Sequence, residues 1–166
     1  MKHEQSVYNK LHKFSAKEAA KYEFSNQFAT LRSELMKAFS FIEPKKARGI
    51  GALNAPVREI ERLMQDLKSA SLSEIESIVS QVKNKKIEVE QSLKTIEDDI
   101  DTIDRMTNSI KQELKPLEAL AIEMGGKPQQ VPLWKQGMQV IDMGRQVILE
   151  YSMLRNDMRQ FLKEIK

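Results

Sequence analysis

The stretch that decides the fold lies at residues 72–124 and reads LSEIESIVSQVKNKKIEVEQSLKTIEDDIDTIDRMTNSIKQELKPLEALAIEM. An apolar side chain recurs at every seventh position of this stretch. The recurring residues are Ile75, Val82, Val89, Ile96, Ile103, Ile110, Leu117 and Met124. A companion row, three or four positions away, contains Leu72, Val79, Lys86, Leu93, Ile100, Thr107, Leu114 and Ala121. Because seven residues make about two helical turns, the pattern predicts one very long α-helix with a continuous seam.

The flanking residues indicate where this helix begins and ends. Ser71 precedes it and Glu74 follows three positions later, which is the spacing of a capping box. Gly125 and Gly126 follow the last turn and favour a left-handed cap. Pro116 lacks a backbone N–H, which predicts a kink near that residue, although the seam continues beyond it. At 1.5 Å per residue the helix would be roughly 80 Å long, so the sequence predicts an elongated molecule.

Apolar spacing and punctuation divide the whole chain into one predicted helical domain, residues 1–166. Its segments are a basic N-terminal arm at 1–14, a helix at 15–42, a loop at 43–55, a short helix at 56–69, the long helix at 72–124 and a C-terminal helix at 133–165. The first loop is placed before Pro44 because the residue that precedes a proline avoids helical angles. Gly137 and Gly144 lie on the seam of the C-terminal helix, which predicts that a neighbouring backbone approaches closely there.

The charges beside the seam favour packing within one chain over a parallel dimer. In a parallel dimer Asp99 would face Asp104 of the other chain, and the two carboxylates would repel. Lys86 and Thr107 would also lie inside the two-stranded seam. We therefore expect an all-α fold, an elongated antiparallel helical bundle or coiled coil with one very long central helix. Self-association is expected as well, because a broad apolar stripe needs cover.

Composition supports the same fold class. Of 166 residues, 31% are charged, 40% are apolar and only 6% are aromatic, with six Gly and five Pro, which favours long helices with few interruptions. The chain has no cysteine, so disulfides and sulfur-based zinc sites are excluded. No secretory signal is visible, and no stretch approaches the ~20 apolar residues of a membrane span. We expect a cytoplasmic protein.

The net charge of +3 is distributed unevenly. Residues 1–48 contain ten Lys/Arg and five Asp/Glu, whereas residues 49–124 contain ten and fifteen. This asymmetry favours, first, packing of the basic part on the acidic part and, second, an anionic outside partner. The candidate contacts to an anion or a partner are Lys10, Lys13, Lys17, Lys21, Lys45, Lys46 and Arg48. The candidate apolar contacts are Tyr8, Leu11, Phe14 and Trp134.

The sequence predicts no catalytic, cofactor-binding or metal-binding site. His3 and His12 are the only histidines, and both lie in the basic arm without a fixed carboxylate or nucleophile nearby. Acidic residues cluster over 97–104, but a calcium site needs a loop with a glycine at its bend, whereas the pattern here predicts a helix. The glycines near Lys45 lack the spacing of a nucleotide-binding loop. We expect no cofactor and no small-molecule substrate.

These observations favour a non-enzymatic structural or adaptor protein that acts by protein–protein association, as a scaffold, an assembly factor or a component of a larger complex. Two alternatives stay open. The first is a nucleic-acid-binding accessory protein that uses the basic arm and the 43–55 loop. The second is a membrane-surface-binding helical protein in which Tyr8, Leu11 and Phe14 insert into the lipid.

Overall fold

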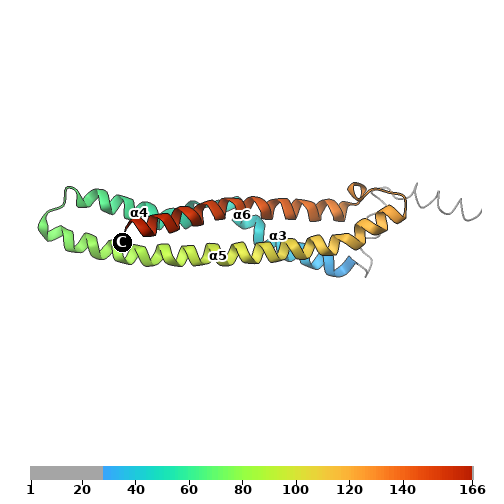
Figure 1. Ribbon diagram of the computed structural model, residues 1–166, viewed down its shortest axis with the longest axis horizontal. Coiled ribbons are helices and arrows are strands. Elements are labelled where there is room, and N and C mark those ends of the chain that lie inside the picture. Colours follow the sequence, from blue (N-terminus) through green and yellow to red (C-terminus); the bar gives the residue numbers. More distant parts are fainter. Residues whose placement is uncertain (1–27, 166) are drawn as a thin grey trace, which may run out of the picture. The chain divides into compact units, whose positions relative to one another are not determined.

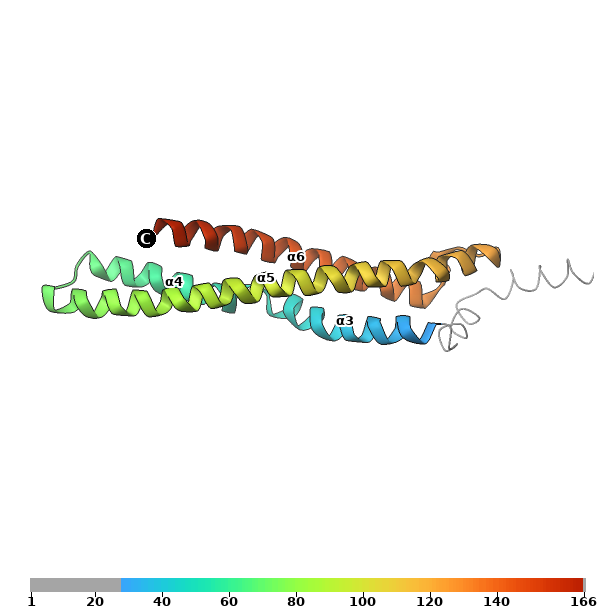
Figure 2. The ribbon, with the colours of Figure 1, turned by 60° about the horizontal axis from the view of Figure 1, so that its bottom comes forward.

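The computed structural model describes residues 28–165, and helices occupy all of that range except short connections. The elements, shown in Figures 1 and 2, are α3 (Ala29–Arg48), α4 (Gly51–Leu67), α5 (Leu72–Glu123), the 3-10 helix η2 (Pro128–Gln130) and α6 (Pro132–Glu164). The predicted all-α helical bundle with one very long helix is confirmed. The arm predicted at 1–14, and the first part of the helix predicted at 15–42, lie outside the described residues.

Helix α5 contains 52 residues, and its ends lie within one residue of the predicted ones. At its start, the carbonyl oxygen of Ser71 accepts a hydrogen bond from the N–H of Glu74 at 3.0 Å. At its end, Gly125 has a φ of 78°, and the Gly126 N–H donates to the Ala121 carbonyl at 2.8 Å. Glycine adopts this left-handed conformation without a steric penalty, so the chain leaves the helix within one residue.

Pro116 lies inside α5, and the helix continues through it as predicted. Its missing N–H deprives the Gln112 carbonyl of the usual intrahelical hydrogen bond. Both residues are exposed, so water can reach that carbonyl, while Leu114 and Leu117 beside them are buried. Packing of the two leucines therefore offsets the local cost of the proline. The kink itself stays a prediction.

The loop predicted over 43–55 is wrong, because helix occupies most of that range. Helix α3 continues through Pro44 to Arg48, and α4 begins at Gly51, so only residues 49 and 50 connect them. The helix predicted at 56–69 accordingly begins five residues earlier, and it ends at Leu67.

Glycine, not proline, ends α3. Gly49 has a φ of 70°, and its N–H donates to the Lys45 carbonyl at 3.0 Å, which closes the last helical turn. Pro44 removes one hydrogen bond, the one to the Ser40 carbonyl, but both residues are exposed and water can replace it. Ile42, two residues before the proline, is fully buried and holds this part of the helix in the core.

The chain divides into two compact units. Unit 1 contains the described residues up to Pro44 together with Ile103–Arg145, and unit 2 contains Lys45–Thr102 together with Gln146–Lys166. Helices α5 and α6 contribute residues to both units, α3 contributes mainly to unit 1, and α4 contributes to unit 2 alone.

Unit 1 is a three-helix bundle in which α3 and α6 both run antiparallel to α5. On α3, the Glu34 carboxylate accepts a hydrogen bond from Ser109 of α5 at 2.9 Å. On α6, Trp134 donates to the Glu118 carboxylate of α5 at 2.9 Å. The buried residues of the unit are Phe28, Leu31, Leu35, Ala38, Ile42, Ile103, Thr107, Ile110, Leu114, Leu117, Ala121, Val131, Leu133, Val140 and Ile141.

Unit 2 combines α4, the first part of α5 and the last part of α6. Arg159 of α6 donates a hydrogen bond to Glu97 of α5 at 2.6 Å, and the pair also forms an ion pair. The buried residues are Val57, Ile60, Leu63, Ile78, Val89, Ile96, Val147, Tyr151, Leu154 and Met158. Helix α6 ends partway along this part of α5, so the hairpin of α4 and α5 extends beyond it (Figure 1).

Candidate interaction surfaces

The two rows of the heptad pattern on α5 differ in which of their members are buried. In the first row, five consecutive members are buried with at most 2% of their surface exposed, namely Val89, Ile96, Ile103, Ile110 and Leu117. In the companion row, the buried members are Thr107, Leu114 and Ala121, all in unit 1. The same row begins with Leu72 and Val79 in unit 2, where 89% and 39% of their surfaces are exposed. The pattern therefore continues past the point at which the described helices cover it.

The exposed part of α5 lies in the hairpin that α6 does not reach. Two helices packed together bury one face each, whereas a third helix is needed to cover a second face. Ile87, which is 53% exposed, lies in the same part of α5, and Met64 of α4 is exposed as well. This end of unit 2 thus presents large apolar side chains to solvent, which marks it as a candidate interaction surface.

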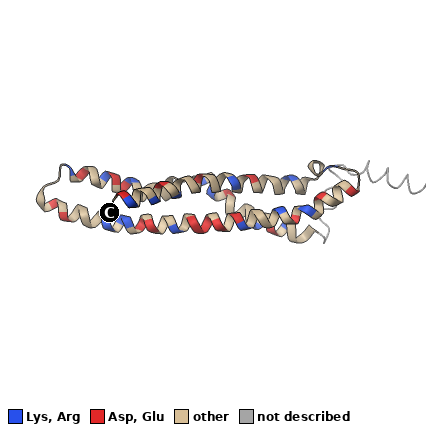
Figure 3. Cartoon of the chain, in the orientation of Figure 1, with Lys and Arg blue, Asp and Glu red and all other residues tan. Residues whose placement is uncertain are grey.

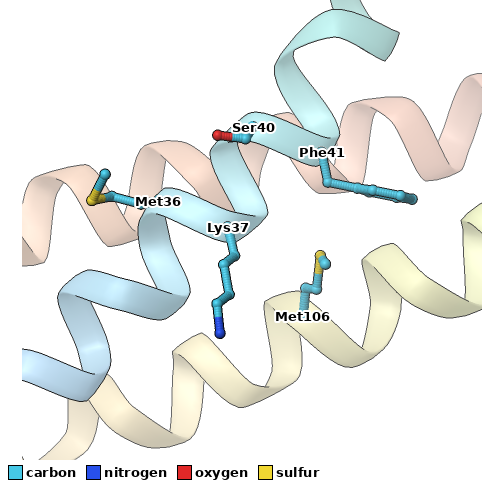
Figure 4. A pocket seen from close by; sticks show the side chains of 5 residues that line it. All are labelled: Met36, Lys37, Ser40, Phe41 and Met106. Carbon is cyan, nitrogen blue, oxygen red and sulfur yellow. The ribbon is translucent and has the colours of Figure 1, made fainter.

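A second candidate surface is an open hollow between α3 and α5 in unit 1, called here the α3–α5 hollow. Its volume is about 520 Å³, and its lining is almost entirely apolar. The lining residues are Met36, Lys37, Ser40, Phe41 and Met106. Figure 4 shows Met106 pointing from α5 toward α3, while Lys37 reaches from α3 toward α5.

One lining residue of the hollow, Met36, is largely exposed, and Phe39, which does not line the hollow, is an exposed apolar neighbour of Met36 on α3. Met36 is 72% exposed and Phe39 is 48% exposed, and they lie three residues apart, so they are neighbours on the helix surface. Small-molecule sites usually enclose their ligand and converge several polar groups on it. An open hollow with one lysine and one hydroxyl is better suited to side chains of a protein, and methionine adapts its shape to them.

The structure places two of the predicted anion contacts against the chain's own residues. Lys45 and Arg48 lie near Asp99 in unit 2, where their positive charges oppose the rise that burial causes in the pKa of Asp99. Arg48 also lies near the hydroxyl of Tyr151. Lys45 is half-buried, whereas Lys46 and Arg48 are exposed. The basic loop predicted for an anionic outside partner is therefore mostly helical, and Lys45 and Arg48 lie near charged or polar groups of the chain itself.

Tyr151 is fully buried at the centre of this group. Burial raises the pKa of its hydroxyl, while the nearby guanidinium of Arg48 acts in the opposite direction. No hydrogen bond of standard geometry reaches the hydroxyl oxygen among the described residues, so the contact with Arg48 is a poorly aligned one. Arg48 of α3, Asp99 of α5 and Tyr151 of α6 thus come together in unit 2.

Two carboxylates meet at the edge of α3 and α5 in unit 1. Partial burial raises the pKa of Glu113, and the neighbouring Glu34 raises it further through charge repulsion and a hydrogen bond to the protonated form. Ser109 satisfies one oxygen of Glu34. The two carboxylates thus form a like-charge contact between α3 and α5 in unit 1.

Trp134 was predicted as an apolar contact, and the structure makes it an anchor in unit 1. Its ring is half-buried, and its indole N–H donates to Glu118 across the α5–α6 pair. The remaining predicted contacts, which belong to the basic arm, lie outside the described residues. They are Tyr8, Lys10, Leu11, Lys13, Phe14, Lys17 and Lys21.

The acidic cluster over 97–104 lies on α5, as predicted, and red bands gather along the middle of that helix in Figure 3. Its carboxylates therefore point around a helix instead of converging in a loop. Among residues 28–165, no group of three His, Cys, Asp or Glu side chains is arranged to hold a metal ion. Within the same range, no helix combines the length and the apolar composition of a transmembrane span.

Comparison with known proteins gives no match: no family model, no curated protein and no solved structure is significantly similar to this chain.

Sequence reasoning missed both candidate surfaces. Met36 and Phe39 follow the helical spacing of α3, but their faces cannot be assigned without the positions of α5 and α6. Leu72 and Val79 belong to an unbroken heptad row, so their exposure depends on where a third helix ends. The one sequence feature that pointed to self-association was the breadth of the apolar stripe.

Proposed function

We propose that the protein is non-enzymatic and acts by protein–protein association, as an adaptor or scaffold, with the α3–α5 hollow as its contact surface. The observation that carries the proposal is the exposure of Met36 in the lining of an apolar hollow, on a helix whose other face is packed in the core. Contiguous apolar surface of this kind on a folded unit is typical of a binding site.

The partner that fits the hollow is an amphipathic helix of another protein. Its apolar side chains would enter between Phe41 and Met106, where methionine can adjust to them. An acidic residue at the border of that apolar face would pair with Lys37, which is the only charged group in the lining. Such a partner covers the exposed Met36 and leaves no charge unpaired.

The test compares two methionine substitutions in the full chain. Met36→Glu places a charge at the hollow, whereas Met153→Glu introduces the same change at a methionine of α6 in unit 2 that is also largely exposed, 61% against 72%. Both variants should retain the helical circular dichroism of the parent. After affinity capture from a nuclease-treated host extract, we expect the Met36 variant to lose the specifically bound protein by about tenfold or more, as at an interface hot spot, and the Met153 variant to retain it. Equal capture by both variants, or capture of no protein by the parent, would overturn the proposal.

The nucleic-acid alternative has less support than the sequence suggested, because Lys45 and Arg48 face Asp99 and Tyr151. It predicts a gel shift that weakens steeply as salt increases. The membrane-surface alternative predicts co-sedimentation with anionic vesicles. The association proposal predicts neither result, so either one would favour the corresponding alternative.

A further inference from the structure

A second copy of this chain is the partner that best fits the exposed face of α5 in unit 2. The face consists of Leu72, Glu76, Val79, Ser80, Lys83 and Ile87, called here the α5 stripe. All six residues are exposed. At about 100° per residue they fall within about 100° of the helix circumference, so they form one face.

The stripe is built from two parallel rows with four-residue spacing. One row is Leu72, Glu76 and Ser80, and the other is Val79, Lys83 and Ile87. Rows with this spacing are ridges of the helix surface, and in the shallow crossing of about 20° that keeps two helices side by side, ridges of one helix lie in grooves of the other. The α5 stripe therefore has the geometry of a helix-packing face, but no described helix of the chain packs on it.

The order of the residue types makes the stripe complementary to itself in the antiparallel direction. A two-fold axis between Val79 and Ser80 places Leu72 opposite Ile87 of the partner subunit, and Glu76 opposite Lys83 of the partner subunit. Val79 then meets the partner's Ser80 at the axis. Each of these contacts occurs twice, because a two-fold interface is the same on both copies. Apolar residues thus meet at both ends of the contact, and opposite charges meet between them.

A parallel arrangement of the same faces lacks this complementarity. In register, Glu76 would face the partner's Glu76, and Lys83 would face the partner's Lys83, so both pairs would repel. Charge therefore selects the antiparallel direction.

We propose that the protein forms a two-fold antiparallel dimer through the α5 stripe. The inference rests on the proposed association function but uses a different surface from the α3–α5 hollow. The contact is short, since residues 72–87 span about 24 Å of helix at 1.5 Å per residue. An interface below about 1,200 Å² is typical of weak encounters, so we expect a dissociation constant on the order of 100 μM.

The experiment uses charge reversal in the full chain, with sedimentation equilibrium at low ionic strength as the measurement. Glu76→Lys alone and Lys83→Glu alone each convert two attractive pairs into two repulsive ones. We expect each variant to dimerise about tenfold or more weakly than the parent, which corresponds to several exposed ion-pair energies. The residues changed in the tests of this dimer, Glu76, Lys83 and Leu72, are all exposed. We therefore expect the substitutions to leave the fold intact.

Two combinations then separate this dimer from any other. The double variant Glu76→Lys with Lys83→Glu restores opposite charges and should dimerise like the parent. An equimolar mixture of the two single variants should form a heterodimer, because lysines of one chain then face glutamates of the other. Leu72→Ser should weaken both the parent dimer and this heterodimer.

A parent chain that stays monomeric at millimolar concentration would overturn the inference, and so would a mixture of single variants that forms no heterodimer. The proposed function is unaffected by that result, because its test changes Met36 and measures capture of a different protein. The opposite outcome is also possible. A dimer that responds to charge reversal as described would support the dimer, while equal capture by the Met36 and Met153 variants would refute the α3–α5 hollow as the contact surface for another protein.

Discussion

A Cβ atom placed on Gly144 of α6 would lie 2.6 Å from the Cγ2 of Thr107 on α5. The two helices of unit 1 are therefore closer at this point than any side chain on α6 would allow. Ile103 adds a second methyl group at 3.1 Å, and both neighbours are β-branched and have few alternative rotamers. The seam glycines, Gly144 and Gly137, do mark close packing of α6 on α5, but the atoms that a Cβ would meet belong to side chains and not to a neighbouring backbone.

We expect Gly144→Ala to destabilise the protein. Alanine is favoured over glycine in a helix by about 1 kcal/mol, but overpacking against rigid neighbours typically costs about 1–3 kcal/mol. The net loss in the free energy of unfolding should be about 1 kcal/mol, measured by urea denaturation.

Three variants provide controls for this prediction. Gly137→Ala meets only the flexible end of Leu114, at 2.9 Å, so its effect should be smaller. Gly51→Ala meets no atom within 4 Å and should be neutral or stabilising. Thr107→Ser removes the nearest methyl group and should recover part of the Gly144→Ala loss. A Gly144→Ala protein more stable than the parent would contradict the close approach.

Glu118→Ala should loosen the anchor between α5 and α6 at Trp134. The lost hydrogen bond, 2.9 Å from the indole nitrogen to the carboxylate, should lower the free energy of unfolding by about 1 kcal/mol. Trp134 is the only tryptophan, so its fluorescence reports on this site alone, and the emission should shift to longer wavelength as water reaches the ring. Lys115→Ala, an exposed change on the same helix, serves as the control. An unchanged spectrum together with unchanged stability would refute the anchor.

Glu113→Gln should stabilise the protein at neutral pH but not in acid. The pKa of Glu113 is raised in the folded state, so the folded protein binds a proton more tightly than the unfolded chain does. The stability contributed by this group is therefore full below the unfolded value of 4.5 and is lost as pH rises through the folded pKa. Glutamine carries no charge, so the variant avoids the loss of stability that ionised Glu113 causes at neutral pH. We expect this difference to be about 0.5 kcal/mol, the size of a like-charge pair on a helix surface.

The measurement for Glu113→Gln is the difference in unfolding free energy from the parent at pH 7 and at pH 3. The difference should favour the variant at pH 7 and approach zero at pH 3. Glu90→Gln neutralises an exposed carboxylate elsewhere on α5 and serves as the matched control. A variant that is less stable than the parent at pH 7 would show that Glu34 does not repel Glu113.

Tyr151→Phe should leave the free energy of unfolding unchanged within about 0.5 kcal/mol, or raise it, because the buried hydroxyl oxygen lacks a hydrogen bond of standard geometry. Tyr151→Ala removes the ring as well and should cost about 3–5 kcal/mol, since the side chain is fully buried. Comparison of the two by chemical denaturation separates the hydroxyl from the ring. A loss above about 1.5 kcal/mol for Tyr151→Phe would show that Arg48 forms a strong hydrogen bond with it.

Much of the fold could be predicted from local patterns. The seven-residue row that includes Ile96 and Ile103 is determined by covalent order and helical periodicity, so its shared face follows without knowledge of any partner helix. Gly125 ends α5 because only its backbone conformation favours that turn, and the same reasoning applies to Gly49. Pro44 was weighed too heavily, because the rule for prolines describes local strain and omits the packing of Ile42 that offsets it.

The candidate surfaces could not be predicted, because exposure depends on neighbours far away in the sequence. Leu72 and Leu114 belong to the same heptad row, yet the first is 89% exposed and the second is buried. Lys45 and Arg48 formed a basic group in the sequence, but only the fold shows that Asp99, some fifty residues later in the chain, lies near both of them.

The sequence by itself determined which residues form helices and which side chains share a face, because both follow from the 3.6-residue period and from local stop residues. Only the tertiary structure decided which of those faces are covered. A helix face is buried where another helix lies against it, and α6 ends partway along α5 in unit 2, so Leu72 and Val79 stay exposed while Thr107 and Leu114 of the same row are buried.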